Sequence, residues 1–425
     1  MRAALWFLAL FGIAVAVALF AGNNQGTVTV FWPPYRVDLS LNLILLMLFG
    51  GFALLHIALR ALAALLDLPV QANRWRTQQK ERAMHVALLD ALAHLSAGRF
   101  IRSRKAAEAA IAQEKALVGS GEPLAHAVQV RALAHLLAAE SAHALQDRTA
   151  RDHHLAQALE QTADNPSGPA QEVREGTQLR AAGWALQDRD APAALEWLEG
   201  LPQGAGRRTL ALRLRLRATR LARQTQQALE TARLLAKHRA FSAVAASSIV
   251  RGLATELLNG AHDTAQLTRV WLSFEPAERA TPELAIHAAS RLQQLQGDPS
   301  QVRTWLLPAW EAMLTDADAL PSLLQVRLVR TLEADMASVD GSWLARIENA
   351  QQHNPRDPHL QYLAGMACLR RQLWGKAQQL LGQASQQLLQ PELRSSAWRA
   401  LAELAEQRED ADAAAQAWRQ AAAIR

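Results

Sequence analysis

The sequence predicts an all-α protein, with a two-helix transmembrane hairpin at the N-terminus followed by an α-solenoid of helical hairpins. Three observations lead to this prediction. Two long apolar stretches lie within the first 66 residues. A long region rich in alanine and leucine follows, with few β-branched runs, which is a composition typical of helices. Near the C-terminus, small residues recur at the spacing of paired helices that cross closely.

The two apolar stretches are each long enough to cross a bilayer. The first runs from Ala3 to Ala21 without a charge, and the second runs from Leu39 to Leu59 and ends at Arg60. A bilayer core about 30 Å thick needs about 20 apolar residues in a helix. The short connection makes residues 1–66 a transmembrane hairpin. A cleaved signal peptide is the alternative for the first stretch, although the apolar run of a signal peptide is usually shorter, about 7–15 residues.

The orientation of this hairpin follows from its flanking basic residues. The loop from Gly22 to Asp38 carries Arg36 alone. Cytoplasmic flanks are enriched in Lys and Arg. The sequence therefore predicts two membrane spans, an outward loop and a largely cytoplasmic chain. The basic residues that follow the second stretch are Arg60, Arg74, Arg76, Lys80 and Arg82.

The outward loop has the pattern of a short β-hairpin. Apolar and polar residues alternate from Thr27 to Trp32 and from Arg36 to Leu39, with Pro33 and Pro34 between them. Alternation on both sides of a proline turn predicts two strands. Because two strands are only marginally stable alone, we interpret them as a small cap on the membrane hairpin.

Loop signals divide the region after Pro69 into helix pairs, which indicates a repeat architecture. These signals are clusters of Pro, Gly, Asn and Asp at residues 164–169, 200–206, 275–282, 297–299 and 353–358. We predict a juxtamembrane helix and N-terminal hairpins over residues 67–165, irregular hairpins over residues 166–350, and C-terminal repeats over residues 351–425.

The C-terminal repeats have the small-residue spacing of tetratricopeptide repeats (TPRs). Ala377 and Ala414 are separated by close to the TPR period of about 34 residues. A degenerate copy begins near Ala91, and a generic alanine-rich hairpin is the alternative. Stacked pairs bury the faces that isolated pairs expose, so we predict one solenoid. The matching positions are Gly365, Trp374, Ala377, Leu381 and Ala384, then Trp398, Leu401, Ala402, Ala405, Ala414, Trp418 and Ala421.

Composition and motifs argue against several classes of protein. Cys368 is the only cysteine among 425 residues, which excludes an intramolecular disulfide, a CxxC pair and a cysteine-based zinc site. The net charge of +6 is modest and accompanies no nucleic-acid-binding motif, so we expect no nucleic-acid partner. No HExxH, GxSxG or Walker A sequence is present. We therefore predict no enzyme and no metal site.

The segment from Arg207 to Arg223 alternates leucine and arginine, and its helical neighbours favour a helix with a broad basic face. The functional interpretation is a surface for an acidic protein partner or for porphyrin carboxylates. A solvated face, paired with acidic residues of adjacent repeats, is the alternative. The candidate partner-binding residues are Arg208, Arg213, Arg215, Arg217 and Arg220.

Three histidines are candidates for binding haem or a porphyrin, because one histidine can be an axial haem ligand. His56 lies inside the second apolar stretch, where ionisable residues are functional candidates. His135 and His143 are eight residues apart, on one face of a predicted helix. The alternative is that each of them is an ordinary surface or interface residue. The sequence therefore does not establish that the protein binds a cofactor.

The whole chain resembles the proteobacterial HemY family. The resemblance is carried by the opening from Arg2 to Trp6, the loop sequence from Asn23 to Trp32, and the segment from Leu92 to Phe100. It implies a bacterial inner-membrane protein that organises haem-pathway enzymes and catalyses no step itself. An unrelated flavin-dependent protoporphyrinogen oxidase shares the name, but its dinucleotide-binding glycines are absent here. A TPR assembly or regulatory factor for envelope proteins or lipopolysaccharide is the alternative function.

Overall fold

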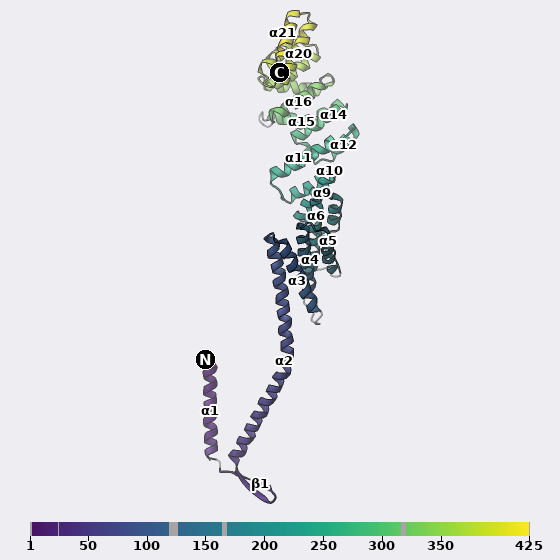
Figure 1. Cartoon of the computed structure of the whole chain (residues 1–425). Coiled ribbons are helices and arrows are strands. Elements are labelled where there is room, and N and C mark those ends of the chain that lie inside the picture. The colour runs from purple at the N-terminus through teal and green to yellow at the C-terminus, as the bar shows by residue number, and fades with distance from the viewer. Residues whose placement is uncertain (1, 24, 119–125, 164–167, 316–319, 425) are drawn as a thin grey trace. The chain divides into compact units, whose positions relative to one another are not determined.

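The computed structural model describes residues 2–23, 25–118, 126–163, 168–315 and 320–424. These residues are mostly helical, with one β-hairpin near the N-terminus (Figure 1). The all-α prediction is therefore confirmed. The chain divides into two compact units, Met1–Arg174 and Glu175–Arg425.

The predicted β-hairpin is confirmed. Its strands are antiparallel, and Trp32 pairs with Tyr35 across the turn. The Thr29 hydroxyl donates a hydrogen bond to Asp38 Oδ1 at 2.5 Å, and the Arg36 guanidinium lies 5.7 Å from the centre of the Phe31 ring. The elements of this region are α1 (Arg2–Asn23), β1 (Thr27–Trp32), β2 (Tyr35–Ser40) and α2 (Leu41–Ser96).

One apolar stretch of the described residues is long enough to cross a membrane. It covers 26 residues of α2, Leu41–Leu66, and none of it is buried. It extends past the predicted end at Leu59 because Ala61 to Leu66 continue the apolar run beyond Arg60. The apolar segment found in α1, Leu8–Leu19, is shorter. The structure thus contains one clear candidate span, and the second predicted span is not confirmed.

The end of α2 belongs to the first helical hairpin. It packs against α3 (Phe100–Val118), which also packs against α4 (Ala127–Ala144), and α4 pairs with α5 (Arg148–Gln161). Ala91, Ala107 and Ala138 are fully buried together where α2, α3 and α4 meet. Alanine allows this close approach because it is small. The apolar stretch Leu41–Leu66 and the first hairpin therefore share one continuous helix.

The second unit continues the same architecture. α9 pairs with α10, α14 with α15, α18 with α19, and α20 with α21. The first helices of successive pairs also touch, since α14 contacts both α11 and α16. Helix pairs stacked in this way form a TPR-like α-solenoid. The helices are α6 (Pro169–Gln187), α7 (Ala191–Glu199), α8 (Gln203–Gly206), α9 (Thr209–Leu221), α10 (Thr225–Lys237), α11 (Ala243–Asn259), α12 (Thr264–Leu272), α13 (Pro276–Arg279), α14 (Pro282–Gln294), α15 (Pro299–Thr315), α16 (Ser322–Ala334), the 3-10 helix η1 (Met336–Ser338), α17 (Gly341–His353), α18 (Pro358–Arg370), α19 (Trp374–Gln387), α20 (Pro391–Gln407) and α21 (Ala411–Ala423).

The predicted helix crossings of the last two hairpins are confirmed. Ala377 and Ala414 are buried, at 0% and 5% exposure. Gly365 on α18 lies so close to α19 that an added Cβ would be 2.7 Å from Leu381 Cγ. The small residues stand where the backbones approach most closely.

One turn geometry joins the two helices of many hairpins. Gln146, Gln372 and Glu409 all have φ between 56° and 60°. The next residue donates its N–H back to the preceding helix, as from Asp147 to the Ala142 carbonyl at 2.9 Å. This is the Schellman arrangement. The Asp147 carboxylate then accepts the Ala150 N–H and caps the following helix.

Candidate functional site

The arginine-rich segment folds into α9, which packs between α7 and α10. Leu212, Leu214 and Leu216 are all buried, because neighbouring helices cover α9 on more than one side. The exposed arginines are those at the i, i+4 and i+7 positions of the uncovered side. The sequence predicted a broad basic face, but the exposed arginines of α9 form only a narrow strip. This α9 strip consists of Arg213, Arg217 and Arg220.

Three of the five candidate arginines bind to the protein itself. Arg208 pairs with Glu175, with 2.9 Å between Nη1 and Oε2. Arg215 donates to the Leu198 carbonyl at 3.2 Å, at the C-terminal end of α7, where a cation is favourable. Arg213 donates to the Ala240 carbonyl at 2.8 Å. These contacts stabilise the packing around α9.

Arg217 and Arg220 remain in solvent. Both are exposed, and neither guanidinium forms a hydrogen bond or ion pair with any residue that the structure describes. They lie one turn apart on the same side of α9 as Arg213. This part of the strip can therefore meet an anionic partner without first giving up a contact within the protein.

His135 does not share a site with His143. The two lie on α4, where eight residues correspond to a rise of about 12 Å. His143 Nδ1 is 3.4 Å from Arg151 Nη1. His56 is exposed on the apolar stretch of α2, and the structure gives it no partner among the described residues. The three candidate histidines are therefore not brought together.

The partner of His135 is His154, on α5. Their Nδ1 atoms are 3.0 Å apart, and their ring centres are 5.3 Å apart. Burial, followed by the proximity of His154 and Lys115, lowers the pKa of His135 from 6.5 to about 4. Burial, followed by His153, also lowers the pKa of His154. At neutral pH both rings are uncharged, so one Nδ1 donates and the other accepts.

This pair contains no third ligand. Among the described residues, no three His, Cys, Asp or Glu side chains are grouped closely enough to hold a metal ion. Glu108 lies at the edge of the pair, with its Oε1 4.0 Å from His154 Nε2. The arrangement links α4 to α5 through neutral imidazoles, and it titrates on acidification.

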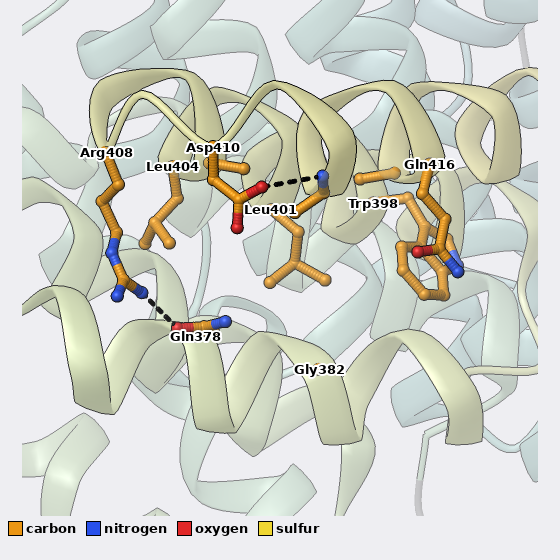
Figure 2. A pocket seen from close by; sticks show the side chains of 11 residues that line it. Gln378, Gly382, Trp398, Leu401, Leu404, Arg408, Asp410 and Gln416 are labelled. Atoms are coloured by element: carbon orange, nitrogen blue, oxygen red, sulfur yellow. Dashed lines mark hydrogen bonds between the residues drawn. The ribbon is translucent and has the colours of Figure 1, made fainter.

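A hollow of about 470 Å³ lies between α19, α20 and α21. Figure 2 shows Trp398 and Gln416 at one end, and Arg408 hydrogen-bonded to Gln378 at the other. Gly382 has nothing within 4 Å of where a Cβ would lie, so the hollow stays open on the α19 side. Its lining combines an indole and leucines with amide and guanidinium groups. It can therefore contact both the apolar and the polar parts of a peptide.

Residues 26–146 match the family described as the HemY protein N-terminus. No curated protein matches the chain.

Among solved structures, the chain is similar to the crystal structure of the APC/C hetero-tetramer Cut9-Hcn1, with 14% identity over 79% of this chain and 65% of that chain and a TM-score of 0.28. It is similar to Naa15/Naa10 bound to HypK-THB, with 12% identity, coverage of 76% and 56%, and a TM-score of 0.26. For the P58(IPK) TPR domain the identity is 16%, the coverage 77% and 99%, and the TM-score 0.22. The chain spans less than two thirds of the first two structures. At these TM-scores the likeness carries no argument, and the repeat architecture rests on the helix pairs described above.

Proposed function

Because the chain belongs to the HemY family through residues 26–146, we propose that it is a scaffold anchored in the bacterial inner membrane that organises late haem-biosynthesis enzymes and catalyses no step itself. Residues 1–66 form the anchor in this proposal. Residues 67–425 form a cytoplasmic recognition region of N-terminal, irregular and C-terminal hairpins. Haem or a porphyrin is included as a ligand that such a scaffold hands between its partners.

The observation that supports this proposal most directly is the continuity of α2. The helix begins in the apolar stretch Leu41–Leu66 and ends at Ser96, inside the first hairpin. A soluble enzyme bound to the hairpins would therefore be held near the bilayer. Confinement of this kind raises the effective concentration of bound partners without requiring new contacts.

The proposal is tested by crosslinking the full chain in native membranes and identifying captured proteins by mass spectrometry. We expect late haem-pathway enzymes, and we expect haem output to fall when residues 1–66 are deleted. Capture of envelope or lipopolysaccharide factors instead, with normal haem levels in a deletion strain, would support the alternative function. Turnover of a porphyrin precursor by the purified chain would contradict a non-catalytic scaffold.

Both termini are expected in the cytosol, with the β1–β2 hairpin outside. Arg36 stands alone in the loop, whereas Arg74, Arg76, Lys80 and Arg82 follow the α2 span. Alkaline phosphatase is active only outside the cytosol, so it should be inactive when fused after Arg425 and active when inserted between Pro33 and Pro34. A green fluorescent protein fusion at the same two positions serves as the opposite reporter. Phosphatase activity at the C-terminus would contradict the predicted cytosolic location of both termini.

Reversing the charge of the α9 strip is expected to weaken partner association. Arg217→Glu with Arg220→Glu should lower affinity about ten-fold, since two like-charge contacts replace two attractive ones. The remaining association should depend less on salt, and pull-down at two ionic strengths measures both effects. Arg346→Glu, at an exposed position of α17, is the control for a charge reversal away from the strip. Equal losses in the control and the double variant would argue against a specific surface.

A further inference from the structure

A second hollow, of about 530 Å³, lies in the Glu175–Arg425 unit across the first helices of three successive pairs. α11 contributes Asn259, α14 contributes His287 and Arg291, and α16 contributes Arg327 and Arg330. None of these residues belongs to the α9 strip or to the histidine pair. The hollow is a separate feature, and its lining is rich in groups that donate hydrogen bonds.

Two guanidinium groups of this hollow have no carboxylate partner among the described residues. Arg291 donates to the Ala261 carbonyl at 3.1 Å and to Gln294 Oε1 at 3.2 Å, while its Nε is buried without a hydrogen bond. Arg327 is exposed, and its guanidinium forms no hydrogen bond or ion pair with the described residues, although its backbone carbonyl accepts the Thr331 hydroxyl at 2.8 Å.

The acidic residues nearby are already paired. Arg330 pairs with Glu392 at 3.2 Å, and Glu283, which lines the hollow, pairs with Arg251 at 3.2 Å. Neither carboxylate is therefore left to neutralise Arg291 or Arg327. The two unpaired guanidiniums leave the hollow with an excess of positive charge.

His287 adds an uncharged acceptor to the same hollow. Burial, followed by the positive charges of Arg327 and Arg291, lowers its pKa. Its Nε2 is 2.8 Å from Asn259 Oδ1. Because an amide oxygen accepts, Nε2–H is the donor, and Nδ1 of the neutral ring remains an acceptor. Carboxylates can therefore bind the guanidiniums while a backbone N–H binds the imidazole.

We propose that this hollow binds an acidic, extended segment of a partner protein, with its carboxylates on Arg291 and Arg327. Asn259 Oδ1 is bound by His287, and Gln293 Nε2 donates to the Thr331 carbonyl at 3.2 Å, so Asn259 Nδ2 and Gln293 Oε1 are the amide atoms offered to the peptide backbone. The apolar lining found among the described residues is limited to Ile286 and Leu324, which is too little to sandwich a flat macrocycle such as a porphyrin. This inference depends on the proposed scaffold function in one respect, which is that the ligand of the hollow is a segment of a protein.

The test is fluorescence anisotropy with the full chain in nanodiscs of zwitterionic lipid. The probes are a fluorescein-labelled hexaglutamate peptide and its hexaglutamine counterpart. We expect the hexaglutamate peptide alone to bind, and Arg327→Gln to weaken it by about ten-fold or more, since hydrogen bonds to charged groups contribute this much. Arg327→Lys, which keeps the charge, should bind more tightly than Arg327→Gln. Arg346→Gln on α17 is the matched control and should bind as the wild type does.

Circular dichroism should show that Arg327→Gln folds normally, because this side chain holds no internal contact. If Arg327→Gln has a lower melting temperature than the wild type, Arg327→Lys becomes the test variant. Hexaglutamate affinity of Arg327→Lys as low as that of Arg327→Gln would then contradict the proposal. Equal binding of the two peptides would overturn it. So would equal losses in Arg346→Gln and Arg327→Gln, or no peptide binding together with Arg327-dependent binding of a dicarboxylate porphyrin. Capture of haem-pathway enzymes from membranes without hexaglutamate binding would contradict this inference alone and leave the proposed function in place.

Discussion

Replacing Gly365 by leucine is expected to lower the free energy of unfolding by about 3 kcal/mol, the upper part of the range for overpacked cores. Even a Cβ at this position would lie 2.7 Å from Leu381 Cγ and 3.2 Å from the Leu381 backbone nitrogen. Leu381 is fully buried and cannot turn away. α18 and α19 would therefore have to separate. Urea unfolding followed by circular dichroism measures the loss.

Gly382→Ala is the matched control on α19, because nothing lies within 4 Å of the added Cβ. Alanine is favoured over glycine in a helix by about 1 kcal/mol, so this variant should be unchanged or slightly more stable. A Gly365→Leu chain as stable as the wild type would show that α18 and α19 do not cross at Gly365.

Acidification is expected to remove up to about 3 kcal/mol of stability through His135. The unfolded residue titrates near pH 6.5, and the folded one has its pKa lowered to about 4. Between these values the unfolded state binds more protons, so stability is present above pH 6.5 and is lost as the pH falls to 4. The groups around the ring are His154 and His153 on α5, Lys115 on α3 and Arg131 on α4 itself.

His135→Gln should reduce this dependence, because glutamine does not titrate. The measurement is the difference in unfolding free energy between pH 7 and pH 4.5, for the wild type and the variant. His85→Gln, which removes an exposed histidine of α2, should leave that difference in place. An identical pH dependence in His135→Gln and the wild type would show that the buried imidazole pair is not its source.

The parts of the fold that could be predicted from the sequence are those that depend on local periodicity. The β1–β2 hairpin follows from alternation around Pro33 and Pro34. The crossings at Ala377 and Ala414 follow from small residues repeated near the TPR period. The turns inside many hairpins could not be found by a search for glycine, because Gln146, Gln372 and similar residues hold the positive φ.

The candidate site was less predictable because its contacts join helices that are distant in sequence. His135 could be singled out, but its partner His154 lies on the facing helix of the hairpin. The arginines of α9 could be found as a cluster. Which of these arginines are already hydrogen-bonded within the protein depends on carbonyl groups of α7 and of the loop before α11. The hollow around Arg327 combines three helices without any motif, so only the packed structure shows it.

Because α2 is one continuous helix, it also fixes the direction in which the first hairpin points around the helix axis. At about 1.5 Å and 100° per residue, each residue between Leu66 and the first hairpin changes both the height of that hairpin and its heading around the helix axis. One extra residue near Lys80 would swing the hairpin by about 100° while lifting it by only about 1.5 Å. Seven extra residues would lift it by about 10 Å yet return it to within about 20° of its original heading. The register of this helix thus specifies which side of the first hairpin faces a neighbour bound beside the apolar stretch of α2.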